Sequence, residues 1–295
     1  MIPSVGPHKP EACELSGSSK RFGVFAILLK IGRLSLLLAL LGSLLPCYGL
    51  QFNTKLRPQT VVSFDAYARQ VEQEQSQRCE GKKTFLRIEE DPETLRSVMN
   101  GQLFVERSTS STPLDIPDGL IHDWYGAVFI PHSTLQRVLS VLQDFDHHAG
   151  IYPQVTRSKL IKRDGNDITG YWRLEQKKQG IQTVFDVTQH AHYEEISPSE
   201  LIVKSYAKDI DAVEGAGSAH ERVRATGEGM GLLWRLYAYW NLKAVDGGVL
   251  AECRSVSLSR GLPGGIGWMI RPFLQSVPKD SMDSTLRSTR KAASE

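Results

Sequence analysis

A series of strand-like segments between residues 155 and 260 constrains the fold of this chain more than any other feature. The segments are rich in β-branched and aromatic residues, and each ends at a turn signal that contains Gly or Pro. The predicted strands span residues 155–162, 168–176, 182–196, 200–210, 232–245 and 249–260. Because the connections are short, no parallel crossover is needed, and we expect neighbouring strands to pair in the antiparallel sense.

One further strand and two helical regions flank this series. Residues 121–130 predict a strand, and the Ser133 hydroxyl is expected to cap the helix that begins directly after it. Residues 265–293 predict a long helix with an apolar stripe, kinked or interrupted at Pro272 and Pro278 because each proline removes a backbone donor. An antiparallel sheet with helices on one face belongs to the α+β class.

The first 49 residues have the pattern of an export signal. Residues 34–45 are almost entirely Leu and Ala, and Lys30 and Arg33 precede them. A short apolar run after positive charge is typical of a secretory signal, whereas a membrane span needs about 20 apolar residues. We therefore expect residues 1–49 to direct export to the periplasm or the cell exterior. An uncleaved single-pass membrane anchor is the alternative.

Residues 50–117 predict a small helical extension followed by a linker. Apolar residues recur at helical spacing after residue 58, and Asp91 precedes a second short helix with Pro92 in its first turn. Residues 108–117 are rich in Ser, Thr and Pro, as linkers are. The main domain is accordingly expected at 118–295.

Composition excludes several classes of protein. With 41% hydrophobic and 23% charged residues, the chain is not disordered, collagen-like or a coiled coil. The net charge of +2 comes from the first 49 residues, which carry +3, so the remainder carries −1 and has no basic excess for binding nucleic acid. Beyond residue 49 only Cys79 and Cys253 occur, which is too few for a disulfide framework.

The order of elements, together with several local motifs, resembles the helix-grip fold of the START-like, polyketide cyclase and Bet v 1 (SRPBCC) superfamily. The motifs lie at residues 124–131, 143–146, 152–153, 231–240 and 264–268, and the resemblance covers residues 118–293. The chain also resembles signal-bearing START-like proteins of some bacteria. The resemblance implies a curved antiparallel sheet wrapped around a long C-terminal helix, with a cavity between them.

Such a cavity would be lined by apolar and aromatic side chains of the sheet and the last helix. In residues 232–245 one face carries Trp234, Leu236 and Trp240, and we expect this face to point inward. The candidate cavity residues are Trp124, Tyr171, Arg173, Phe185, Trp234, Leu236, Trp240, Glu252, Met269 and Phe273. The alternative is a packed core with only a small void.

No recognisable motif for catalysis, metal or cofactor binding stands out. His147 and His148 follow a helix end, and His190 and His192 share one face of a strand, but neither pair has an evident third ligand. We therefore expect no metal and no cofactor.

The sequence favours a noncatalytic, exported domain that binds a lipid, isoprenoid or polycyclic molecule, with possible contact to a membrane surface. One alternative is an enzyme of the cyclase or hydratase kind, with Tyr171, Arg173, Asp186 and Glu252 as inward polar groups. Another is a membrane-tethered interaction module, in which residues 58–117 pack on the domain or on a partner.

Overall fold

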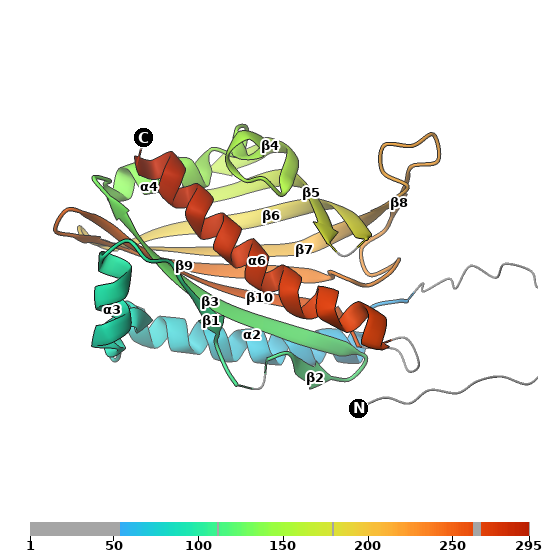
Figure 1. Cartoon of the computed structure of the whole chain (residues 1–295), viewed down its shortest axis with the longest axis horizontal. Helices are drawn as coiled ribbons and strands as arrows, with labels where there is room; N and C mark the ends of the chain where they lie inside the picture. The colour runs from blue at the N-terminus through green and yellow to red at the C-terminus, as the bar shows by residue number, and fades with distance from the viewer. Residues whose placement is uncertain (1–53, 111, 179, 262–266, 295) are drawn as a thin grey trace, which may run out of the picture. The chain divides into compact units, whose positions relative to one another are not determined.

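The computed structural model describes residues 54–110, 112–178, 180–261 and 267–294 (Figure 1). The segment predicted to be a signal or anchor lies outside the described residues. The helices are α2 (Pro58–Cys79), η1 (Arg87–Glu90), α3 (Pro92–Met99), α4 (Leu135–Gln143), α5 (His148–Ile151) and α6 (Gly267–Ser294). The strands are β1 (Phe104–Arg107), β2 (Leu114–Ile116), β3 (Gly119–Pro131), β4 (Val155–Asp164), β5 (Asp167–Lys178), β6 (Ile181–Ser197), β7 (Glu200–Glu214), β8 (Arg222–Arg224), β9 (Arg235–Val245) and β10 (Gly248–Arg260).

All described strands form one antiparallel sheet, in the order β1-β3-β10-β9-β7-β6-β5-β4. The short strands β2 and β8 pair with β3 and β7 respectively. The long pairing of β3 with β10, from Gly119 opposite Arg260 to Pro131 opposite Gly248, joins the two ends of the strand series. This order and the helix α6 across the sheet confirm the predicted α+β helix-grip fold.

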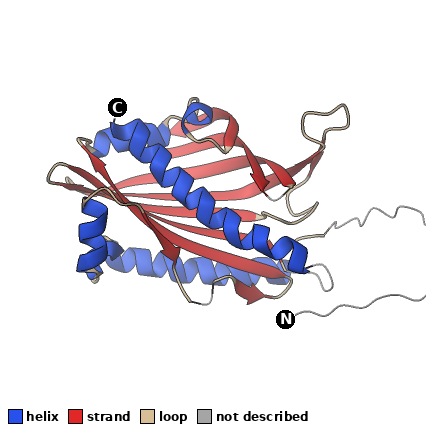
Figure 2. Cartoon of the chain, in the orientation of Figure 1, coloured by secondary structure: helices blue, strands red, loops and turns tan. Residues whose placement is uncertain are grey.

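Helices cover both faces of this sheet. Helix α6 crosses the face that we call the inner face, while α2 runs along the opposite, outer face (Figure 2). Strand alternation separates the two: Leu236, Ala238 and Trp240 point to the inner face, and Tyr237 and Tyr239 pack with α2 on the outer face.

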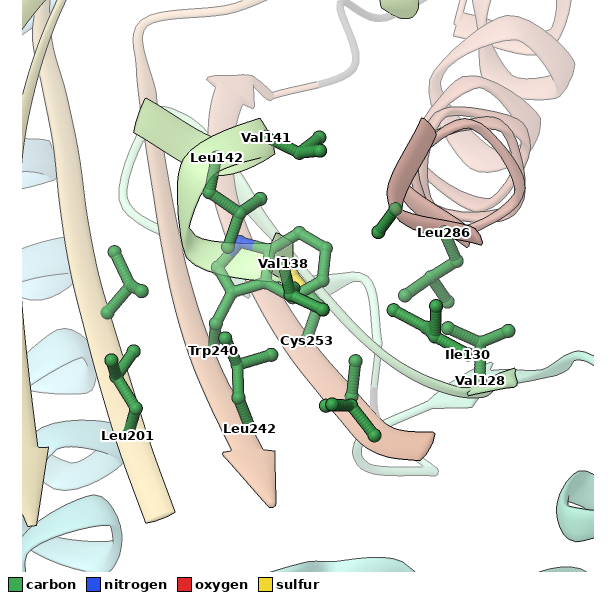
Figure 3. Close-up of a cluster of buried hydrophobic side chains, with 14 of the residues drawn as sticks. Val128, Ile130, Val138, Val141, Leu142, Leu201, Trp240, Leu242, Cys253 and Leu286 are labelled. Atoms are coloured by element: carbon green, nitrogen blue, oxygen red, sulfur yellow. The ribbon is translucent and has the colours of Figure 1, made fainter. Parts of the chain in front are cut away.

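One end of the inner face is a packed apolar core. Val138 and Leu142 of α4 lie over Trp240 and Leu242 of β9, and Leu286 of α6 packs beside them (Figure 3). Helix α4 begins one residue later than predicted, because the Thr134 hydroxyl accepts from the backbone N–H of Arg137 and so provides the cap.

Helix α6 continues through both of its prolines. Pro272 and Pro278 were expected to kink or interrupt it, and they do not interrupt it, because the helix runs from Gly267 to Ser294. Each proline removes one backbone hydrogen bond. Burial of Phe273 and Leu286 against the sheet, which favours the helix, outweighs that loss.

The N-terminal extension packs on the sheet and adds strands to it. The helices expected there are present as α2 and α3, and Phe64, Ala68 and Val71 of α2 are buried against the outer face. The segment expected to be a linker, 108–117, instead contains β2, which pairs with β3. Residues 52–295 thus form one compact unit.

Two further observations concern the described residues. Cys79 and Cys253 are both free thiols, and Cys253 is buried. None of the described helices combines the length and the apolar character that a membrane crossing requires.

Candidate functional site

A cavity of about 210 Å³ lies between the inner face of the sheet and α6. Strands β5, β6, β7, β9 and β10 form its floor, and side chains of α4, α5 and α6 close its sides. It adjoins the packed core beneath α4, so one part of the inner face is filled and the neighbouring part is hollow.

A row of small side chains explains why this part of the sheet is hollow. Ser255 of β10 lies opposite Ala238 of β9, which in turn lies opposite Ser205 of β7, and Ser205 lies opposite Ala191 of β6. All four line the cavity. Neighbouring strands are about 4.8 Å apart, so this row leaves a strip roughly 14 Å long from which no large side chain rises toward α6.

Aromatic side chains form a rigid wall beside this floor. Trp172 stacks on Phe145 with ring centroids 5.5 Å apart, and its indole N–H donates to Nδ1 of His148 at 2.9 Å. Nε2 of His148 donates to the carbonyl of Val141 at 3.0 Å. One ring nitrogen accepts while the other donates, which requires the neutral imidazole. Consistently, burial lowers the pKa of His148 to about 4.

The described lining of the cavity carries no Asp, Glu, Lys or Arg side chain. Its second histidine, His122, is 2% exposed and hydrogen bonds through Nε2 to the hydroxyl of Ser259 at 2.9 Å. Burial lowers the pKa of His122 to about 4, so this ring is also neutral at pH 7. The cavity is therefore apolar with a few uncharged polar groups, the usual character of a site for small molecules.

The structure brings four of the ten predicted cavity residues together. Phe185, Leu236, Trp240 and Phe273 line the cavity. Trp124 lies on the inner face but in the packed core, with the Arg107 guanidinium over its ring. The side chain of Met269 lies outside the described residues.

The predicted polar groups of β5 and β6 lie on the outer face. Arg173 forms an ion pair with Asp186, with its Nε 2.8 Å from Oδ1, and also contacts Glu221 at 3.0 Å. The Tyr171 hydroxyl donates to the same Asp186 oxygen at 2.6 Å. The neighbours Trp172 and Leu174 line the cavity, so strand alternation points Tyr171 and Arg173 away from it.

Trp234 and Glu252 also lie on the outer face. Trp234 packs in the cluster beneath α2. Glu252 accepts hydrogen bonds from the backbone N–H groups of Arg87 and Ile88, at 2.9 and 2.6 Å, and from the Tyr125 hydroxyl. Burial raises its pKa to about 7 although these hydrogen bonds lower it. No acid or base proposed for a cyclase-like reaction therefore contacts the cavity.

The histidine pairs have local partners. His147 pairs with Asp144 at 2.8 Å, and His192 pairs with Asp167 at 2.9 Å. Among residues 54–294, as far as they are described, no group of three His, Cys, Asp or Glu side chains is arranged to hold a metal ion.

Sequence reasoning singled out His148 but missed other polar groups of the cavity, such as His122, Gln189, Ser205 and Ser255. No motif marks them, because they come from different elements. The small residues at matching register positions are a possible signal, but they can be aligned only once the strand pairing is known.

No model of a protein family matches the sequence, and no curated protein is significantly similar to it. Similar solved structures include a STAR-related lipid transfer protein fragment from Xanthomonas axonopodis, 17% identical over 65% of this chain and 99% of that chain, with a TM-score of 0.42. An aromatase/cyclase from Streptomyces is 10% identical over 59% of this chain and 93% of that chain (TM-score 0.41). Human STARD10 is 11% identical over 69% of this chain and 78% of that chain (TM-score 0.38).

Proposed function

We propose that this domain binds a small, mainly apolar molecule in the cavity beneath α6. The observation that carries the proposal is the row of small residues, which keeps a void of about 210 Å³ where the neighbouring core is densely packed. Protein interiors seldom leave such space, because a void forfeits dispersion contacts. A bound apolar molecule would restore dispersion contacts to the side chains that line the cavity.

The size of the cavity limits the ligand. An apolar cavity of about 150 Å³ holds one benzene ring. The cavity here, at about 210 Å³, therefore suits a molecule of one or two rings, or a short isoprenoid. The uncharged lining favours the apolar part of such a molecule over an ionic group.

An apolar fluorescent probe tests this function. The naphthalene dye Prodan is neutral, has two fused rings and brightens in apolar surroundings. We expect saturable binding by the wild type and at least tenfold weaker binding by Ala238→Phe, because that side chain would occupy the floor of the cavity. The matched control is Ala219→Phe, in an exposed loop, which should bind as the wild type does. Equal binding by all three folded proteins would overturn the proposal.

We further propose that the domain functions after export. The support is the apolar run at residues 34–45 behind Lys30 and Arg33. Sequencing the N-terminus of the protein from its own host should find a start near residue 50. A chain that keeps its first residues would contradict cleavage and favour the membrane anchor.

A further inference from the structure

One polar side chain in the cavity has no partner for a buried atom. Gln189 of β6 is 8% exposed and lines the cavity, and its Oε1 is buried without a hydrogen-bond partner among the described residues. Its neighbours in the sheet are Gly170 on β5 and Ala207 on β7, neither of which has a polar side chain. The residues paired with Gln189 on the two neighbouring strands thus offer no side-chain donor to its Oε1.

The other buried polar groups of the wall contrast with Gln189. Both nitrogens of His148 are bonded, the Tyr193 hydroxyl donates to the Leu142 carbonyl at 3.0 Å, and the Tyr152 hydroxyl bonds to Thr289 at 3.1 Å. A buried polar group without a partner costs about 1–3 kcal/mol. This cost, confined to one group that lines the cavity, indicates that the missing partner belongs to a bound molecule.

The charge of the lining restricts what that partner can be. A carboxylate or phosphate in the cavity would meet no described cation, since the lining has no Lys or Arg and both of its histidines are neutral. An ammonium group would likewise meet no carboxylate. Burial of an unpaired charge is far more costly than burial of a neutral hydroxyl.

We propose, on the basis of the binding function above, that the ligand is an uncharged molecule whose hydroxyl group donates to Oε1 of Gln189. The hydroxyl also has lone pairs that can accept from the amide nitrogen of the same side chain. A phenol, or an alcohol on a ring or isoprenoid chain, has the required chemistry. Gln189 is then a residue that selects the ligand, while the apolar walls supply most of the affinity.

Three probes that share one ring system test this selection: naphthalene, 2-naphthol and 2-naphthoate, each titrated by calorimetry. For the wild type we expect 2-naphthol to bind about tenfold more tightly than naphthalene, which is the worth of one hydrogen bond to a buried acceptor. We expect 2-naphthoate to bind most weakly. Gln189→Met should remove the preference for 2-naphthol and leave naphthalene bound.

The matched control is Gln182→Met, on the same strand but exposed, with its amide bonded to Glu175 at 2.8 Å. It should keep the wild-type preference. Equal binding of 2-naphthol and naphthalene by the wild type would overturn the inference and leave the proposed function intact, and it requires no variant to fold. Retention of the preference in Gln189→Met, or tight binding of 2-naphthoate, would also overturn it. Failure of all three probes would overturn the proposed function as well.

Discussion

The two faces of the sheet are built from the same strands, but they differ in their buried polar groups. The outer face buries paired charges, whereas the described lining of the inner cavity is uncharged. On the outer face, Asp123 is fully buried, and Arg254 bonds to it through Nη2 at 2.7 Å while also reaching Glu74 at 2.6 Å. Glu252 has three donors there. On the inner face the described lining of the cavity has no charged side chain, and Oε1 of Gln189 has no partner among the described residues.

This difference shows how one sheet can serve two purposes. Because successive side chains of a strand point to opposite faces, the outer face can be filled and charge-paired without affecting the inner one. Buried charges hold α2 and η1 in place only while their partners remain. The inner face is less tightly packed at the cavity, and this lowers the stability of the fold. The packed and charge-paired outer face offsets that loss of stability.

The largest expected effect is therefore on the outer face. Asp123→Ala would leave the largely buried Arg254 with Glu74 alone and would remove the acceptor of the Tyr67 hydroxyl, which lies 2.6 Å from Asp123. We expect the free energy of unfolding, measured in urea, to fall by about 3 kcal/mol or more.

Asp164→Ala is the control for loss of an ion pair. Asp164 pairs with Lys162 at 3.1 Å, and both side chains are mostly exposed. That variant should lose less than about 1 kcal/mol. Similar losses in the two variants would show that the buried network is not what attaches α2 to the sheet.

The next effect depends on pH. The pKa of Glu252 is raised by burial from its ordinary 4.5 to about 7 in the folded chain. Its contribution to stability is therefore fully present below pH 4.5 and is lost as the pH rises through 7. Relative to Glu252→Gln, the wild type should lose roughly 2–3 kcal/mol between pH 4.5 and pH 8.5. Unfolding curves at several pH values measure this difference, and a constant difference would contradict the assignment.

The covered outer face also explains what the sequence could and could not predict. Period-two alternation placed Leu236 and Trp240 on one face correctly, because β9 is regular from Arg235 to Val245. Trp234 precedes that strand and packs with α2, so extending the alternation to it failed. Glu252 was expected to be an inward polar group, but it lies on the outer face, where the backbone of η1 donates to it.

The alternation of apolar and polar residues along a strand identifies the inner face of a sheet only when the outer face is exposed to solvent. Here Tyr237 and Tyr239 are as buried beneath α2 as Trp240 is beneath α4, so hydrophobicity does not distinguish the faces. The fold was predictable from the order of strands and the last helix. The row of small residues that forms the cavity floor was not, because it depends on the register of four strands, which no local pattern encodes.

A smaller effect on stability is expected when side-chain atoms are added at one position on each face of the sheet. At Gly119, on the outer face, an added Cβ would lie 2.7 Å from Cγ2 of Thr60 and 3.2 Å from Cδ1 of Leu258. Gly119→Ala should therefore cost about 1–3 kcal/mol. Ala238→Val, which extends into the cavity, should stay within about 1 kcal/mol of the wild type. Thermal unfolding of both variants checks this contrast, and equal losses would mean that the inner face is packed as tightly as the outer.

The smallest expected effect on the free energy of unfolding comes from two serines on the inner face of β10. The hydroxyl of Ser259 is the partner of His122 Nε2, so Ser259→Ala leaves a buried ring nitrogen unpaired and should cost about 1–2 kcal/mol. Ser255 lines the cavity and its hydroxyl has no partner among the described residues, so Ser255→Ala should change the unfolding free energy by less than about 0.5 kcal/mol. Urea titrations of the ligand-free variants measure both values. A loss at Ser255 as large as that at Ser259 would mean that the cavity's hydroxyls hold the fold together. A loss at Ser259 alone would show that the Ser255 hydroxyl is not needed for stability and is available to a ligand.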